Sequence, residues 1–378
     1  MAKKIQVDVV TPSPAAVSVT AVNSAGAVRR ASRENSLAKL DLKQSSAGNL
    51  SVDGGNDLSQ YFEQYSPAHV QIAHAHLIPN ELHRDVLEAA IMAMKPALSQ
   101  DTIRSMHQAG QSGNWLNGTL MLGVGPYYLR ETLYLPARTN LVGAEGAFRQ
   151  DQAGSSFRAI GSDWNPQAYL VFWASSGQGN FNGNFAQHCS NIGFNCANRC
   201  RGVFYSGAQS SEMDRCWVTG FTDTGIQLSG GRPVLLRTVT VEFGQSGCVC
   251  VRSDARALNL LNCSLSFCEQ AIVHVNGSLT ATGLMLEHVT GDAIEILQGS
   301  DVLLDGMNFQ SGSSAKQNFL VSNGGTVRFS GTIRNKNSEA VWLNRSGGDN
   351  EILLKGVTSA TNPKYPFAYM CKGSNVIY

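Results

Sequence analysis

A repeat with a period of about 23 residues runs from residue 190 toward the C-terminus and constrains the fold more than any other feature of the chain. One register has the successive steps 23, 23, 23, 22, 25 and 22, between the anchors Val203, Ile226, Val249, Ile272, Ile294, Phe319 and Val341. A second register has the steps 24, 23, 24, 21, 23, 25 and 25, between Ile192, Cys216, Val239, Cys263, Leu284, Met307, Thr332 and Val357. Two registers that drift together indicate a solenoid, because each unit must bury its apolar side against the next unit.

The repeat predicts an all-β fold, a right-handed single-stranded parallel β-helix. The unit is too short for a four-stranded propeller blade, and it lacks the Leu and Asn pattern of leucine-rich repeats. In a β-helix the coils stack at about 4.8 Å, so equivalent residues form ladders along the axis. The aligned residues Cys216, Val239, Cys263, Leu284 and Met307 predict such a ladder in the interior. A glycine content of 38 in 378 residues and a charged fraction of 15% are typical of a turn-rich β chain.

The charge balance and the N-terminus exclude several classes of protein. Lys and Arg number 29 against 28 Asp and Glu, and a net charge of +1 argues against a nucleic-acid or membrane-surface binder. No run of about 18 apolar residues predicts a membrane span, and the basic start has no apolar segment after it that would predict a signal peptide. The 9 cysteines form no C-x-x-C pair, so we expect free thiols and no zinc site.

Changes in residue composition and in hydrophobic periodicity along the chain predict four segments. Residues 1–58 are rich in small and polar residues and carry a net charge of 7 − 5 = +2, which predicts an extended arm. Residues 59–112 form a helical neck or cap, with one helix from an Asn80 N-cap to Pro96 and a second over 102–108. The β-helix is predicted over 113–361, and a C-terminal tail or cap over 362–378.

Several stretches resemble pectate-lyase-like β-helix proteins. Residues 118–129, 133–136 and 141–143 resemble their opening coils, 190–195 and 225–230 resemble middle coils, and 87–90 resembles the capping helix. Within that superfamily the chain looks most like a bacteriophage tailspike or another virion-attached β-helix protein. The resemblance implies a homotrimer, made in the host cytoplasm and located in the virion, and attached to other virion proteins through residues 1–58. Tailspikes are usually longer, and here only 362–378 remain for a C-terminal domain.

Two pairs of carboxylates have the spacing that glycoside hydrolysis requires. Glu269 and Asp292 are one repeat apart, so they predict acids on adjacent coils, about 5 Å from each other, as in a retaining pair. Glu242 and Glu287 are two repeats apart, which predicts a separation of two coils, or about 10 Å, nearer an inverting pair. The alternative is that all four acids lie on solvated turns. The motifs of pectin-degrading relatives, an Asn-x-Asp strand, an Asp-Asp pair and a Gly-His-Gly turn, do not occur.

Other candidate residues are aromatic or histidine side chains. Trp217, Trp342 and Tyr205 are candidate stacking surfaces for sugars, with burial in the core or an interface as the alternative. His74 and His76 are two positions apart, which is a weak metal-pair signal without further ligands, so no metal or other cofactor is predicted.

Three functions remain open from the sequence. The first is a structural virion protein that decorates the capsid, collar or tail, or serves as a spike, and that binds glycans of the host surface. The second is a tailspike depolymerase, a glycoside hydrolase or polysaccharide lyase that degrades capsule or lipopolysaccharide. The third is a stand-alone bacterial polysaccharide lyase. The short chain and its few acidic residues favour the first function. They therefore favour a protein without enzymatic activity, while the two enzyme alternatives stay open.

Overall fold

The computed structural model describes residues 19–22, 28–31, 42–44, 50–52, 58–66, 68–94, 118–136, 138–144, 154–173, 184–185, 187–206, 208–230, 233–275, 277–297, 301–311, 318–322, 325–334, 341–345, 350–354, 358–359, 367–371 and 374–377. The predicted helix over 102–108, the stop at Pro96 and most of the predicted arm lie outside these residues. Within the arm, the described strands are β1 (Val19–Val22) with β2 (Val28–Ala31) and β3 (Leu42–Gln44) with β4 (Leu50–Val52), two antiparallel pairs.

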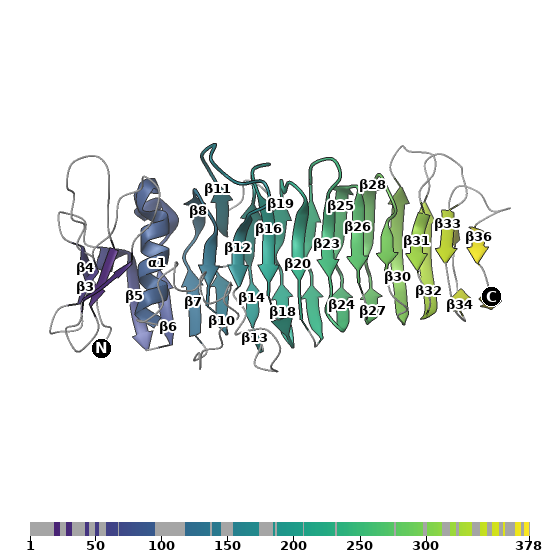
Figure 1. Ribbon diagram of the computed structural model, residues 1–378, viewed down its shortest axis with the longest axis horizontal. Helices are drawn as coiled ribbons and strands as arrows, with labels where there is room; N and C mark the ends of the chain where they lie inside the picture. Colours follow the sequence, from purple (N-terminus) through teal and green to yellow (C-terminus); the bar gives the residue numbers. More distant parts are fainter. Residues whose placement is uncertain are drawn as a thin grey trace.

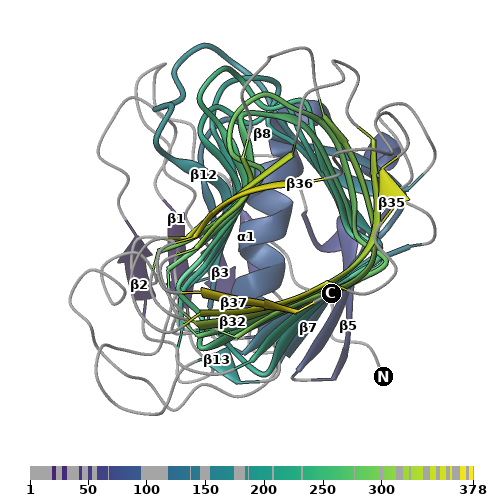
Figure 2. The same ribbon diagram turned by 90° about the vertical axis from the view of Figure 1, so that its right-hand side faces the viewer.

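The chain winds into an elongated parallel β-solenoid, which confirms the predicted β-helix class (Figure 1). Each full coil contributes three short strands, and equivalent strands of successive coils pair in parallel to form three long faces. Seen along the axis, the strands superpose coil upon coil around a common interior (Figure 2). Apolar side chains fill that interior, where most are less than 5% exposed.

The three faces have the following strands. Face 1 contains β7 (Gly118–Leu122), β10 (Thr139–Gly143), β14 (His188–Ser190), β18 (Ser211–Asp214), β21 (Val234–Arg237), β24 (Ala257–Leu261), β27 (Ser278–Thr282), β30 (Val302–Ser311), β32 (Gly325–Arg334), β34 (Asn350–Leu354) and β37 (Ser374–Ile377). Face 2 contains β8 (Gly125–Leu129), β11 (Ser155–Ala159), β15 (Ile192–Asn195), β19 (Trp217–Thr219), β22 (Thr240–Glu242), β25 (Ser264–Cys268), β28 (Met285–Val289), the second halves of β30 and β32, and β35 (Thr358–Ser359). Face 3 contains β9 (Leu133–Leu135), β12 (Tyr169–Trp173), β16 (Arg201–Tyr205), β20 (Thr224–Leu228), β23 (Val249–Ser253), β26 (Gln270–His274), β29 (Ile294–Ile296), β31 (Asn318–Ser322), β33 (Val341–Arg345) and β36 (Phe367–Cys371). Strands β13 (Asn184–Phe185) and β17 (Ala208–Gln209) form a separate parallel pair.

A single left-handed residue makes the corner between faces 1 and 2 in successive coils. These residues have φ values between 49° and 64°: Asn191, Arg215, Thr238, Asn262, Gly283 and Gly306. One residue in this conformation reverses the pleat and bends the chain, so the two faces meet without an intervening loop. The long strands β30 and β32 therefore run through the corner and belong to both faces.

The predicted interior ladder is confirmed from Ile192 to Met307. Its members are paired coil to coil, as the bond from the Thr240 N–H to the Cys216 carbonyl (3.0 Å) shows, and Cys216, Val239, Cys263, Leu284 and Met307 are at most 2% exposed. The prediction at Thr332 is wrong by one residue, because Gly331 is the partner of Met307. The left-handed Gly306 and a register irregularity between Leu304 and Met307 account for the slip.

The other predicted register is correct at Val203, Ile226, Ile272 and Ile294, but wrong at three anchors. Val251, not Val249, pairs with both Ile226 and Ile272. Leu320 pairs with Ile294 in place of the predicted Phe319, and its own partner is Leu343 in place of Val341. The shifts at Val249 and Val341 are of two residues and keep the same side chains on the same face, so the apolar pattern alone does not determine them. The shift at Phe319 is of one residue and coincides with a register irregularity between Asn318 and Leu320.

A helix lies across the N-terminal end of the solenoid (Figures 1 and 2). The hairpin of β5 (Phe62–Ser66) and β6 (His69–Ile72) pairs through β6 with β7. The short helices η2 (Leu58–Tyr61), η3 (Ala75–Leu77) and η4 (Asn80–Leu82) flank α1 (His83–Met94), which is buried almost all round in its second half. Asn80 lies inside η4, so its prediction as the N-cap is wrong: the chain tightens into a 3-10 turn before the α-helix begins.

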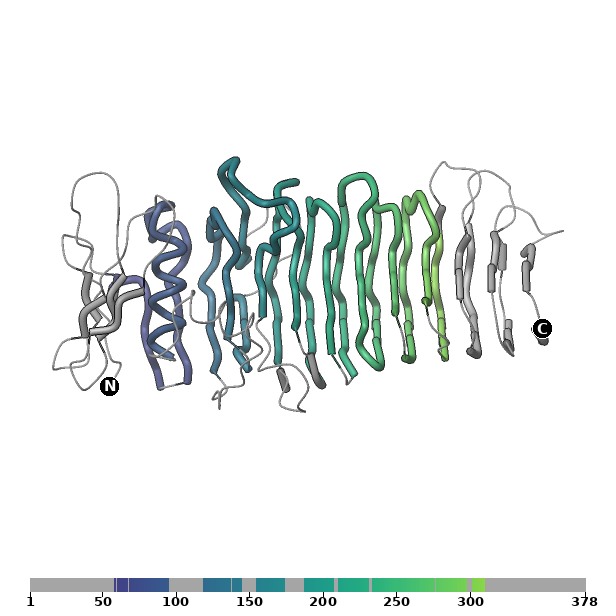
Figure 3. The backbone as a smooth tube through the Cα atoms, viewed as in Figure 1, coloured from purple at the N-terminus to yellow at the C-terminus, as the bar shows by residue number. Residues whose placement is uncertain are grey.

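The strands of the predicted C-terminal tail continue the solenoid. Strand β36 pairs in parallel with β33 on face 3, and β37 pairs in parallel with β34 on face 1. The described strands within 362–378 therefore extend faces 3 and 1. The tube in Figure 3 shows how evenly the coils with described side chains follow one another up to residue 309.

Candidate functional site

Three aromatic rings of neighbouring coils stack on the outside of the solenoid, at the end of face 2. The rings of Phe243 and Phe267 are 4.6 Å apart and inclined by 19°, and those of Phe267 and His288 are 4.5 Å apart and inclined by 18°. Phe243 is 43% exposed and Phe267 is 38% exposed, although each has a ring against at least one face. We call Phe243, Phe267 and His288 the aromatic ladder.

All three residues of the aromatic ladder have a left-handed backbone. Their φ values are 58°, 51° and 50°. Large side chains rarely adopt this conformation, because the Cβ atom crowds the following carbonyl oxygen. Such strain recurs in three consecutive coils and places two exposed rings and one half-buried ring side by side, which is the kind of outlier that marks functional sites.

A groove of about 420 Å³ lies beside the aromatic ladder. Its lining includes Phe267, Glu269, His288, Gln245, Ser246 and Thr290. Phe267 has rings on both faces, so its edge is the part of the ring that the groove can contact. The edge of an aromatic ring is its electropositive part and suits oxygen atoms. With one carboxylate, two hydroxyls and an amide, the groove can bind a polyhydroxylated ligand.

Glu269, one of the predicted acids, lines this groove and is exposed. Asp292 lies in the next coil: the Gly291 N–H donates to the Glu269 carbonyl oxygen (2.7 Å), and Asp292 follows one residue later. The structure therefore brings the two residues into adjacent coils at the turn between faces 2 and 3, but only Glu269 is among the groove residues.

The second predicted pair lies in one column of face 2. Glu242 is in register with Ser266, and Ser266 is in register with Glu287. Two coils separate the acids, which corresponds to about 10 Å between their Cα atoms. Both side chains are half-buried, and the Glu242 carboxylate accepts a hydrogen bond of 2.9 Å from the Trp217 indole N–H.

The predicted sugar-stacking residues are wrong where the structure describes their side chains. Tyr205 is 1% exposed, and its ring stacks on Trp173 at 4.4 Å in the interior. Trp217 is 7% exposed and is held by its bond to Glu242. Both positions are apolar residues of the repeat, so both side chains are buried and neither can stack on a sugar. The side chain of Trp342 lies outside the described residues.

The two candidate metal-binding histidines lie near the N-terminal end. His74 and His76 are exposed, and their rings stack at 5.6 Å. The Val124 N–H donates to Nδ1 of His74 (2.9 Å), so that nitrogen is occupied. Among the described residues, no group of three or more His, Cys, Asp or Glu is arranged to hold a metal ion.

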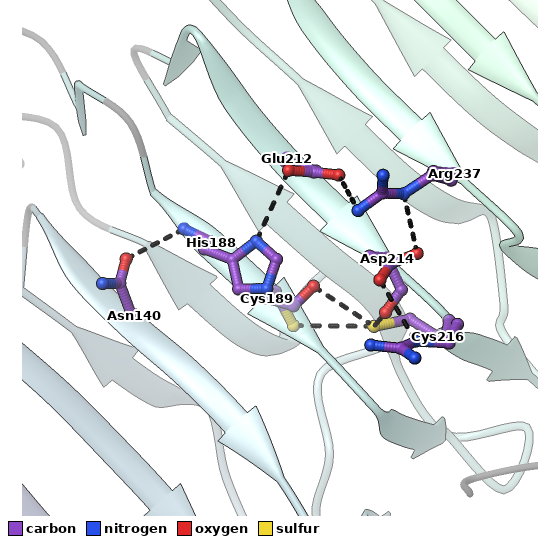
Figure 4. Close-up of polar contacts among 8 residues, drawn as sticks. Asn140, His188, Cys189, Glu212, Asp214, Cys216 and Arg237 are labelled. Atoms are coloured by element: carbon purple, nitrogen blue, oxygen red, sulfur yellow. Dashed lines mark hydrogen bonds and ion pairs between the residues drawn. The ribbon is translucent and has the colours of Figure 1, made fainter.

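A second polar cluster lies on face 1 (Figure 4). Asp214, with a side chain 7% exposed, accepts from Nε of Arg237 (3.0 Å) and from Nε of Arg215 (3.1 Å). Arg237 also contacts the Glu212 carboxylate at 2.7 Å. The neighbouring Asp214 carboxylate raises the pKa of Arg237 above its usual value. Two carboxylates are thus shared between two guanidinium groups.

The cluster continues along the axis to two earlier coils. Nδ1 of His188 lies 3.6 Å from Glu212, and the His188 N–H donates to the Asn140 side chain (2.9 Å). The carboxylates of Asp214 and Glu212 are both engaged by cations, so this cluster is an ion-pair network along face 1.

The described cysteines are buried and unpaired. Burial raises the pKa of the Cys248 thiol to about 12 and that of the Cys263 thiol to about 11. The Sγ atoms of Cys189 and Cys216 lie 3.8 Å apart within the core. These thiols behave as small apolar groups and not as nucleophiles.

The aromatic ladder is the feature that sequence reasoning missed. Its members follow the interior residues Val239, Cys263 and Leu284 by four positions each, so the predicted repeat already aligned them. The signal was present as two phenylalanines and a histidine in one column. What the sequence did not reveal is the left-handed bend that turns them outward.

Comparisons with known proteins add little to this geometry. No protein-family model and no curated protein sequence matches the chain. Among solved structures, it is similar to the protein described as Geobacillus virus E2 ORF18, with 10% identity and a TM-score of 0.47 over 73% of this chain. The chain spans 58% of the length of that protein.

A second solved structure is the A-module of the Azotobacter vinelandii mannuronan C-5 epimerase AlgE6. It has 12% identity and a TM-score of 0.28, over 78% of this chain and 95% of that module. Both TM-scores are below 0.5, so neither similarity bears on what this chain does. Among the described helices, none is long and apolar enough to cross a membrane.

Proposed function

We propose that this chain is a virion-attached β-helix protein of a bacteriophage, a spike or decoration protein whose aromatic-ladder groove binds glycans of the host surface. The observation that carries the binding role is the groove itself, in which the edge of an exposed aromatic ring lies beside hydroxyl, amide and carboxylate groups. Aromatic C–H groups and polar side chains together suit a sugar, which has both apolar and hydroxylated surfaces.

The solenoid supports this role mechanically. Continuous parallel ladders hold the groove residues of three coils in fixed register, so a bound sugar meets a preorganised surface. The attachment to a particle rests on the resemblance of the coils to those of virion β-helix proteins. Residues 1–58 are the segment that we propose for contact with other virion proteins.

A depolymerase is the second candidate function, favoured by the register of Glu242 and Glu287. Two carboxylates two coils apart in one column have the separation that an inverting glycosidase requires. The pair Glu269 and Asp292 is the alternative for a retaining mechanism. Cleavage would release new reducing ends from a bound polysaccharide, whereas a binding protein leaves the polymer intact.

A binding experiment with the full-length chain tests the proposed function. We expect the protein to bind at least one member of a panel of bacterial surface polysaccharides, and Phe267→Asn to weaken that binding by about tenfold or more, because the groove loses its ring. Asn tolerates the left-handed backbone, so the variant retains the local fold. Surface plasmon resonance measures the affinity, and an assay for reducing ends in the same samples detects cleavage.

Tyr65→Asn is the matched control. Tyr65 is 61% exposed but lies on the N-terminal hairpin, away from the groove. Equal loss of binding in both variants, or binding that survives Phe267→Asn unchanged, would contradict the groove as the binding site. Cleavage that disappears in Glu242→Gln or Glu287→Gln would establish the depolymerase instead.

A further inference from the structure

The stretches of sequence that carry the aromatic ladder contain acidic residues and no Lys or Arg. Residues 257–315, which include two of the three coils that carry the ladder, contain no Lys or Arg but six acidic residues: Glu269, Glu287, Asp292, Glu295, Asp301 and Asp305. Residues 238–251, which carry Phe243, contain Glu242 and no basic residue. Along these stretches a ligand in the groove therefore faces acidic side chains and no basic ones.

Within the groove, Glu269 is the charged residue. Its carboxylate is an acceptor, and the neighbouring Gln245, Ser246 and Thr290 can donate or accept hydrogen bonds. A carboxylate that accepts from sugar hydroxyls makes charge-assisted hydrogen bonds. The same carboxylate repels the acid group of a uronic or sulfated sugar, and no Lys or Arg is present among the groove residues to compensate.

The basic residues of these coils lie elsewhere. Arg237 is engaged with Asp214 and Glu212 on face 1. Arg252 lies in β23 on face 3, where it contributes to the environment of Tyr169, and Arg256 directly precedes β24 of face 1. The groove opens instead at the turn between faces 2 and 3.

From this arrangement we infer that the aromatic-ladder groove binds uncharged sugar residues and discriminates against polyanionic glycans. The inference rests on the proposed function and names the substrate class of the same site. It follows from the edge of Phe267, the hydroxyl-binding groups beside it and the acidic surroundings, which together complement a neutral pyranose and oppose a negatively charged one.

The test uses a panel of neutral polysaccharides, dextran, laminarin, galactomannan and xyloglucan, each paired with its carboxymethylated form. The full-length protein is expected to bind at least one neutral polymer, and the carboxymethylated partner at least about tenfold more weakly at low ionic strength. The difference should shrink as salt is added, because salt screens the repulsion. Isothermal titration calorimetry measures both affinities.

The variant Glu269→Gln separates the effect of the negative charge of Glu269 on binding from the effect of its shape. The amide retains the size of the carboxylate but not its charge, so we expect neutral binding to weaken with the loss of the charge-assisted hydrogen bonds. The ratio of the carboxymethylated to the neutral affinity should rise at least about threefold, because the repulsion is removed. Glu81→Gln, which removes an exposed acid near the N-terminal end, should leave the ratio unchanged.

The outcomes distinguish the inference from the proposed function. Equal or tighter binding of the carboxymethylated form, or a ratio that Glu269→Gln does not alter, would overturn the charge discrimination and leave glycan binding intact. Binding to none of the neutral or charged polymers would overturn both. A thermal unfolding curve for each variant excludes loss of fold as the cause.

Discussion

At the scale of single residues, the corner between faces 1 and 2 depends on a backbone conformation that most side chains avoid. Asn and Gly, which tolerate positive φ, fill it at Asn191, Asn262, Gly283 and Gly306. Thr238 is an exposed β-branched residue in the same column, with a φ of 53°. Its backbone N–H still pairs with the next coil, at 2.8 Å from the Leu261 oxygen, so the ladder maintains a strained residue.

Thr238→Asn is therefore expected to stabilise the protein by about 1 kcal/mol, because Asn reaches the left-handed region at lower cost. The midpoint of urea unfolding measures the change. Thr240→Asn is the matched control, since Thr240 is two residues away in the extended strand β22, where Asn is disfavoured. A lower midpoint for Thr238→Asn than for the parent would show that the corner does not store strain.

At the scale of elements, one histidine joins the capping helix to the first coil. His83 begins α1 and is 1% exposed. Its Nε2–H donates to the carbonyl oxygens of Ala75 and Ile78, both at 3.1 Å, and its Nδ1 accepts from the Tyr128 N–H of β8 at 2.9 Å. The ring also stacks on that of Tyr128 at 5.3 Å. This arrangement requires the neutral imidazole, because a proton on Nδ1 would face another N–H.

The helix attachment should therefore weaken in acid. Burial lowers the pKa of His83 below its usual 6.5, so the unfolded chain takes up the proton first as the pH falls. The stabilising contribution is complete above about pH 6.5 and is lost as the pH falls toward the lower, folded-state pKa. The buried His274 has a lowered pKa for the same reason and adds to the effect.

His83→Gln is expected to lose less stability than the parent between about pH 7 and pH 5, because one titrating group is removed. Urea unfolding at the two pH values measures the difference. His76→Gln serves as the control, since His76 is exposed on the neighbouring turn and should leave the pH dependence as it is. A pH dependence that is the same in all three proteins would rule out His83 as an acid-sensitive contact.

At the scale of the whole molecule, a β-solenoid must protect its two ends and its long faces. An uncovered end presents unpaired backbone groups to other chains, and α1 with the β5–β6 hairpin covers the N-terminal end here. Among the described residues, exposed apolar side chains occur on different parts of the surface, such as Leu303 on face 1, Leu297 after β29 and the aromatic ladder. Association around the long axis would bury part of this surface.

We therefore predict that the full-length protein is a homotrimer. Light scattering should give a mass close to three times the chain mass of 40.5 kDa. Unheated samples should also resist SDS, because long parallel ladders unfold slowly. A particle of the monomer mass at micromolar concentration would contradict the trimer and would favour a chain that acts alone or assembles only on its virion.

The sequence by itself determined the fold class, because a period of about 23 residues with inward apolar side chains allows few other architectures. The interior ladder from Ile192 to Met307 followed from the same spacing, as did the adjacent-coil placement of Glu269 and Asp292 and the common column of Glu242 and Glu287. Periodicity reports which coil a residue belongs to, and that is enough for these features.

Only the tertiary structure decided which side chains reach solvent. Tyr205 and Phe267 are both aromatic residues of the repeat, yet one is buried against Trp173 and the other lies on the surface. The difference comes from φ: a strand alternates its side chains strictly, and a left-handed residue breaks that alternation and turns a ring outward. Backbone bends of this kind at Phe243, Phe267 and His288 leave no mark in hydrophobicity, so the groove could be found only in three dimensions.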